Sequence, residues 1–116
     1  MPTLSYAKSL RAIAERNPDF VPELLEDAAN AILNGEMDDG RVFLKDCVNA
    51  TIGFAELGRR LGRDPKNLMR SLRPDGNPTA SNLMAILRAC ADAQSMAIAV
   101  SVTEQPRMPV EAPLPL

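Results

Sequence analysis

The side chains best suited to binding chemistry in this sequence of 116 residues are a cluster of cations in its middle third. Residues 51–90 hold seven Lys or Arg against three Asp or Glu, a local net charge of +4, whereas residues 1–50 carry −4. Guanidinium and ammonium groups donate hydrogen bonds to phosphate oxygens and to guanine. A partner responds to this local field rather than to the net charge of −2 of the whole chain.

The residue types that most catalytic and metal sites need are missing. His is absent and only Cys47 and Cys90 are present, far apart in the chain. This excludes the usual His/Cys zinc clusters, Ser-His-Asp or Cys-His catalysis and a disulfide-stapled scaffold. We interpret the two cysteines as small buried hydrophobes, and Asp38 and Asp39 as a turn and helix cap. We expect no catalytic residue, no metal and no cofactor, and a protein that is not an enzyme.

Two short helices joined by a glycine turn are predicted within residues 54–73. Gly62 is suited to ending the first helix, and Asp64 followed by Pro65 is a specific start signal for the second. Leucines one helical turn apart in each helix would hold the pair together. Gly58 supplies the small residue that the first helix needs where the second crosses it closely.

With its leucines turned inward, the helix over residues 64–72 would present polar side chains to solvent. Arg and Lys can bond guanine O6 and N7, and Asn can bond adenine. We expect base contacts from Lys66, Asn67, Met69 and Arg70, and phosphate contacts from the residues that border them: Arg59, Arg60, Arg63, Arg73, Thr79 and Ser81. For Arg59, Arg60 and Arg63 the alternative is a solvated charged helix face. The adjacent turn glycine and the polar side chains of the next helix, Lys66, Asn67 and Arg70, make that alternative less favourable.

The rest of the chain is predicted to be mostly helical. A helix is expected within residues 1–18, and a domain built on the helix pair over residues 19–95. Residues 96–104 alternate large apolar with small residues, the two-residue period of a strand. A single strand leaves its backbone unpaired, so we expect it to pair with a second copy of the chain or with another protein. Residues 105–116 form a proline-rich tail, predicted to be extended and weakly ordered.

Residues 54–72 (FAELGRRLGRDPKNLMRSL), followed by PDGNPT and an apolar helix, resemble the helix-turn-helix of phage-repressor-type regulators. More narrowly they are similar to the addiction-module antidote proteins, bacterial antitoxins that regulate transcription. Two positions depart from the family pattern: Arg63 stands where a small apolar residue is usual, and Ser71 where an aliphatic residue is usual. The resemblance implies binding of an operator as a homodimer and neutralisation of a small basic toxin encoded beside the gene.

The expected protein is therefore an all-α, repressor-like bundle of about five helices with one C-terminal strand. Its expected function is sequence-specific binding of double-stranded DNA as an antitoxin and autorepressor. A stand-alone regulator without a toxin, and an interaction module that lacks DNA binding, remain alternatives. No apolar run approaches the roughly 20 residues of a membrane span, and no secretory leader is evident. We therefore expect a cytoplasmic protein with no membrane partner.

Overall fold

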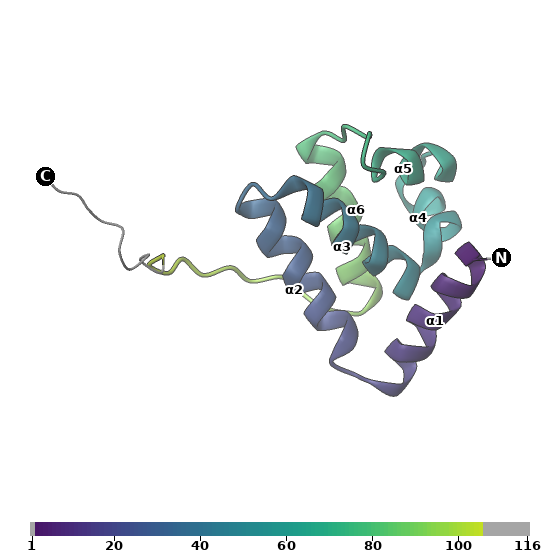
Figure 1. Ribbon diagram of the computed structural model, residues 1–116, viewed down its shortest axis with the longest axis horizontal. Helices are drawn as coiled ribbons and strands as arrows, with labels where there is room; N and C mark the ends of the chain where they lie inside the picture. The colour runs from purple at the N-terminus through teal and green to yellow at the C-terminus, as the bar shows by residue number, and fades with distance from the viewer. Residues whose placement is uncertain (1, 106–116) are drawn as a thin grey trace, which may run out of the picture.

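The computed structural model describes the backbone of residues 2–105 and the side chains of residues 6–105. Six helices lie in this range, and the described residues contain no strand (Figure 1). The predicted all-α class is confirmed, with six helices rather than about five. Their bounds are α1 Pro2–Arg16, α2 Phe20–Leu33, α3 Met37–Ala50, α4 Gly53–Leu61, α5 Pro65–Ser71 and α6 Ala80–Ala93.

The helices begin and end largely where local chemistry places their boundaries. Gly35 follows α2 with a left-handed φ of +82°, a conformation that favours glycine. Thr79 caps α6 by accepting a hydrogen bond from the amide of Asn82. The prediction for Asp38 and Asp39 was wrong, because both lie in the first turn of α3 instead of preceding it. Their carboxylates there face the positive end of the helix dipole, which favours them inside the helix.

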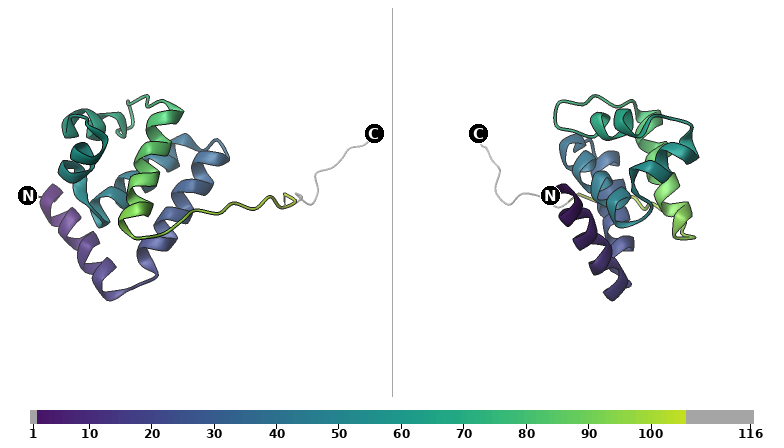
Figure 2. Two further views of the ribbon diagram at one scale, coloured as in Figure 1. Left: turned by 180° about the vertical axis from the view of Figure 1, so that it is seen from behind. Right: turned by 90° about the vertical axis from the view of Figure 1, so that its right-hand side faces the viewer.

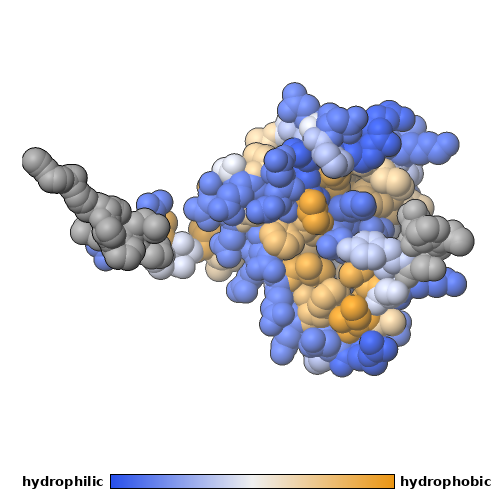
Figure 3. Space-filling model, in the orientation of Figure 1, coloured by the Kyte–Doolittle hydropathy of each residue, from blue (hydrophilic) through white to orange (hydrophobic). Residues whose placement is uncertain are grey.

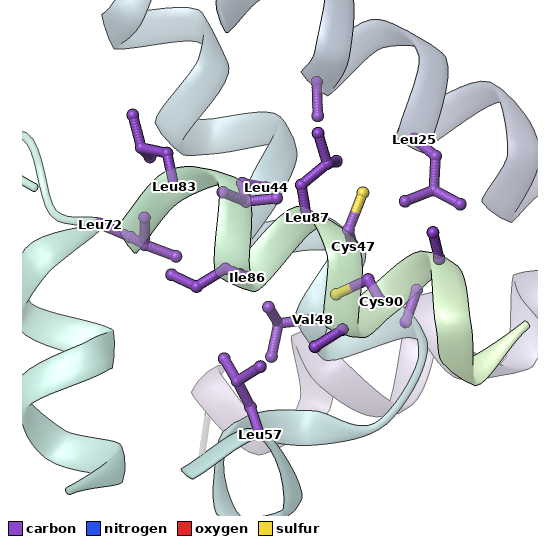
Figure 4. Packing of buried hydrophobic residues seen from close by; sticks show 14 of the residues in the cluster. Leu25, Leu44, Cys47, Val48, Leu57, Leu72, Leu83, Ile86, Leu87 and Cys90 are labelled. Atoms are coloured by element: carbon purple, nitrogen blue, oxygen red, sulfur yellow. The ribbon is translucent and has the colours of Figure 1, made fainter. Parts of the chain in front are cut away.

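The core is centred on α6, which packs against α2, α3 and α4 (Figure 4). Leu83, Ile86 and Cys90 of α6 are fully buried, as are Cys47 of α3 and Leu57 of α4. Both cysteines are free thiols, and burial raises the pKa of Cys90 to about 11. They are therefore uncharged at neutral pH and act as small apolar side chains.

Helix α1 is attached chiefly to α3. Leu10 joins the core, and two polar contacts flank it along the helix. The Tyr6 hydroxyl donates to Asp46 Oδ1 at 2.8 Å, and Arg11 Nε donates to the carbonyl of Asn49 at 3.2 Å. The second contact lies beside the junction between α3 and α4, so α1 braces the end of α3 from which the chain enters α4.

The C-terminal segment, residues 96–105, corrects the prediction of a strand over residues 96–104. It is extended but belongs to no sheet, because the described residues offer no second strand to pair with it. The amide of Met96 donates to the carbonyl of Ala91, after which the segment crosses α2 and runs away from the helices (Figure 2). Of the predicted tail, all but Gln105 lies outside the described residues. No helix among the described residues is long and apolar enough to cross a membrane.

Candidate nucleic-acid interface

The turn between α4 and α5 is built by three consecutive local choices. Gly62 ends α4 in the left-handed conformation, with φ +65° and ψ +38°. The amide of Arg63 then donates to the carbonyl of Gly58 at 2.9 Å. Asp64 caps α5 by accepting a hydrogen bond from the amide of Lys66 at 3.0 Å, and Pro65 occupies the first helical position.

Gly58 lies where the start of α5 touches α4. A Cβ added at Gly58 would lie 2.6 Å from the carbonyl oxygen of Arg63 and 2.8 Å from Cγ of Pro65. The first of these is a backbone atom, which cannot move without shifting the turn. Glycine at this position therefore sets how closely α5 approaches α4, and with it the direction in which α5 points.

The buried side of α5 fixes which of its residues face solvent. Leu68 and the following Leu72 are only 3% and 2% exposed and pack into the core. The opposite face carries the four side chains for which base contacts are predicted, and all four are exposed: Lys66, Asn67, Met69 and Arg70. Figure 3 shows hydrophilic side chains covering the corner of the molecule where α4 and α5 lie.

Shallow hollows surround the exposed face of α5. Lys66, Met69, Arg70 and Arg73 line one of 220 Å³, so a predicted phosphate contact lies beside three predicted base contacts. Asn67 and Arg70 also border a second hollow, and Arg70 Nη1 donates to Asn67 Oδ1 at 2.7 Å. This bond joins the two side chains with the strongest base-reading chemistry. It orients the Asn67 amide so that its NH₂ group points away from the arginine.

Two of the predicted phosphate contacts are paired within α4. Arg59 Nε and Arg60 Nε donate to the carboxylate of Glu56 at 2.8 and 2.9 Å. Hydrogen bonds from the two guanidinium groups lower the pKa of Glu56 to about 2. Glu56 thus remains charged over the physiological range and reduces the positive charge that the end of α4 presents.

Arg63 is exposed, and its guanidinium donates to the side-chain oxygen of Asn82 in the first turn of α6. The side chain thereby ties the turn between α4 and α5 to α6. Thr79 and Ser81 are exposed at this end of α6, where the Thr79 hydroxyl caps the helix. Arg73 is largely exposed and lies 3.7 Å from the carboxylate of Asp75.

Three further residues support this surface, of which the sequence predicted only Gly76, as part of a turn. Arg41 of α3 is mostly buried and donates to the carbonyl of Pro74 at 3.1 Å, which anchors the loop that follows α5. The side-chain oxygen of Asn82 accepts the hydrogen bond from Arg63 described above. Gly76 lies directly against the carbonyl of Ser71, so that any Cβ there would overlap the end of α5. The contacts of Arg41 and Asn82 join distant parts of the chain, and no local pattern marks them.

Ser71 occupies the position at which the helix-turn-helix pattern described above favours an aliphatic residue. Its hydroxyl donates to the carbonyl of Leu68 at 2.8 Å within α5. The hydroxyl is thus satisfied without a tertiary partner, and the next residue, Leu72, fills the core. The described residues contain no group of three or more His, Cys, Asp or Glu arranged to hold a metal ion.

Comparison of the chain with protein-family models, with curated proteins and with solved structures found no match.

Replacing Gly58 with Ala should destabilise the protein by about 1–3 kcal/mol, although Ala is normally the better helix former, because the added methyl group collides with backbone. The matched control is Gly40→Ala. There the nearest atom is Cγ1 of the Ile32 side chain, at 2.9 Å, and a side chain yields with a smaller rearrangement than a backbone carbonyl. Urea unfolding of both variants tests this. An equal decrease in unfolding free energy in the two variants would contradict a special role for Gly58.

Glu56 should make folding stability dependent on acid pH. Its pKa is lowered from the ordinary 4.5 to about 2, so its contribution is complete above pH 4.5 and disappears as the pH falls towards 2. The difference in unfolding free energy between wild type and Glu56→Gln should therefore shrink over this interval. Glu23→Gln, which removes a carboxylate far from the arginines, is the control and should show a weaker trend. Parallel curves for wild type and Glu56→Gln would refute the pairing.

Proposed function

We propose that this chain is a sequence-specific regulator of transcription that binds double-stranded DNA with α5 in the major groove. The supporting observation is the exposed face of α5, which presents Lys66, Asn67 and Arg70 from a helix fixed at Gly58. The major groove is about 12 Å wide and admits an α-helix.

The proposed contacts divide by chemistry. Arg70 and Lys66 suit guanine O6 and N7, and Asn67 suits adenine, once Arg70 exchanges its bond with Asn67 for a base. Arg73, beside them, suits a phosphate. Arg59 and Arg60 would reach phosphates from the end of α4. The negative charge of Glu56 partly neutralises them there and so limits the non-specific affinity for DNA.

Arg63 is better suited to positioning than to a direct phosphate contact. Its bond to Asn82 connects the glycine turn, before α5, to α6. The bond from Arg41 to the carbonyl of Pro74 connects the loop after α5 to α3. Two anchors on rigid helices keep the angle of α5 constant. A recognition helix needs a fixed orientation, because a small displacement of its side chains breaks a bidentate hydrogen bond to a base.

The chain would regulate transcription by occupying an operator. Two copies bound on one face of the duplex would place their half-sites about one helical turn, roughly 34 Å, apart. The resemblance of residues 54–79 to antidote proteins favours an operator upstream of the chain's own gene. Footprinting of that region by the purified protein tests the proposal. An absence of protection at low salt would favour an interaction module without DNA binding.

Arg70→Ala should weaken binding to the protected site by about 1–3 kcal/mol and relax base preference at one position. Arg73→Ala should instead weaken binding to all sequences alike and flatten the salt dependence. Arg16→Ala, an exposed arginine at the end of α1, is the control and should change neither. Titrations of the cognate and a scrambled duplex at several salt concentrations separate the two effects. An unchanged affinity of Arg70→Ala for the cognate site would disprove the assignment of α5.

A second role, as the antitoxin of a small basic protein, is favoured by an acidic hollow of 360 Å³ on α2. Asp19, Glu23 and Glu26 line it together with residues 96–99 of the C-terminal segment. Carboxylates beside an unpaired extended backbone suit a cationic partner that offers a strand edge.

If this role holds, a small basic protein encoded beside the gene should co-purify with the chain. Glu23→Gln should weaken the complex several-fold and make it less dependent on salt, whereas Glu36→Gln, outside the hollow, should not. Isothermal titration of the two purified proteins measures both effects. If the neighbouring protein does not bind, the chain acts as a stand-alone regulator.

A further inference from the structure

An apolar groove of 740 Å³ lies between the C-terminal segment and the bodies of α2 and α6. Ile32 and Leu33 line it from α2, and Met84, Leu87 and Ala91 line it from α6. Arg88 and Asp92 of α6 also border it and pair with each other at 3.1 Å. Leu33 and Met84 are 58% and 47% exposed, so large apolar side chains face solvent here. We call this feature the α2–α6 groove. It lies on a different part of the chain from the α5 surface.

Beyond the amide of Met96, one wall of the groove is backbone that makes no hydrogen bond with any other described residue. Met96, Ile98 and Val100 of the C-terminal segment line the groove, and the last described backbone hydrogen bond of this region is donated by Met96. The backbone donors and acceptors beyond Met96 therefore form an open edge. A two-stranded ribbon alone is only marginally stable in water, but one covered by an apolar helical face is not subject to that limit. The groove thus provides both the edge and the cover for one more extended chain.

The chemistry of the groove indicates what that chain should be. No charged residue occurs between Asp92 and Glu104, so the segment can pair with a copy of itself without like-charge repulsion. The segment lies between the groove and the acidic hollow: residues 96–98 border both, whereas Val100 borders only the groove and Ala99 only the hollow. A neutral, alternating apolar segment therefore belongs in the groove. The chain supplies such a segment, with Val100 and Val102 65% and 97% exposed.

We propose that residues 96–102 of a second copy of this chain fill the α2–α6 groove and pair antiparallel with residues 96–102 of the first. The same contact made in both directions gives a twofold-symmetric dimer with a ribbon between two helical bodies. Antiparallel pairing puts the bodies at opposite ends of the ribbon. This fits a segment that leaves the helices as Figure 2 shows. The proposal deepens the homodimer of the proposed function by naming its interface.

The pattern of side chains also selects the register. Centring the ribbon on Ala99 places Met96 opposite Val102 and Ile98 opposite Val100, so all the large apolar residues of the segment pair with one another. A shift by one residue would put each of them opposite a small one. In the Ala99 register, the two copies of residue 99 are direct neighbours. The two copies of residue 97 are four residues out of step, about 13 Å apart along the strands.

Oligomeric state is measured first, on the full chain without DNA, by light scattering and sedimentation over a range of concentrations. The wild type should be dimeric. Val100→Lys should raise the dimer dissociation constant at least about tenfold, because it buries a charge in an apolar groove. Val42→Lys is the matched control: Val42 is 55% exposed on α3 and outside the groove, so this variant should remain dimeric. Circular dichroism checks that both variants keep their helices.

Cysteine cross-linking then tests the register. Ala99→Cys should give a disulfide-linked dimer under mild oxidation, because direct neighbours meet the distance that a disulfide requires. Ala97→Cys should not. The wild type should also remain uncross-linked, since Cys47 and Cys90 are fully buried.

A monomeric wild type, an unweakened Val100→Lys dimer, or equal cross-linking at residues 97 and 99 would each overturn the proposal. A monomer is also the result expected if the groove takes a small apolar ligand or an unrelated protein. Because no DNA is present, failure here leaves the α5 assignment standing. Loss of DNA binding in Arg70→Ala likewise leaves the dimer standing.

Discussion

The close approach of backbone to backbone at Gly58 is the constraint on which the candidate interface depends. The carbonyl of Arg63 and the ring of Pro65 occupy the space that any side chain at residue 58 would need. This contact sets the separation of α4 and α5. Leu68 and Leu72 then reach the core on one side of α5, and its polar residues face solvent on the other. Steric exclusion at Gly58 thus limits the orientations that α5 can take, and the burial of Leu68 and Leu72 then stabilises the one observed.

Much of this arrangement could be predicted because it is encoded locally. Asp64-Pro65 starts a helix and Gly62 ends one for reasons that involve only neighbouring residues. The leucine spacing defines the buried face of each helix, which fixes the exposed face of α5. Local rules were less successful at Asp38 and Asp39, which are as compatible with a first helical turn as with a cap. Only the structure shows which of these they adopt.

The features that could not be predicted join residues far apart in the chain. Arg41 donates a hydrogen bond to Pro74, and Arg63 donates one to Asn82. The spacing of apolar and polar residues in the sequence predicts neither bond. The C-terminal segment failed as a predicted strand for a related reason. Alternation of apolar and small residues specifies an extended backbone, but a sheet also requires a partner, which the sequence of one chain does not specify. The pairing of Arg59 and Arg60 with Glu56 is different, since it joins residues three and four positions apart, a spacing from which helical periodicity predicts an ion pair.

The contact between α1 and α3 gives the molecule a built-in optical reporter. Its single tyrosine, Tyr6, is the strongest intrinsic chromophore in a sequence without tryptophan. The Tyr6 hydroxyl donates to Asp46, and this hydrogen bond raises the pKa of Tyr6 above its ordinary value. Ultraviolet absorption and emission from this one ring therefore report on the contact between α1 and α3. Detachment of the first helix from α3 becomes visible without any added label.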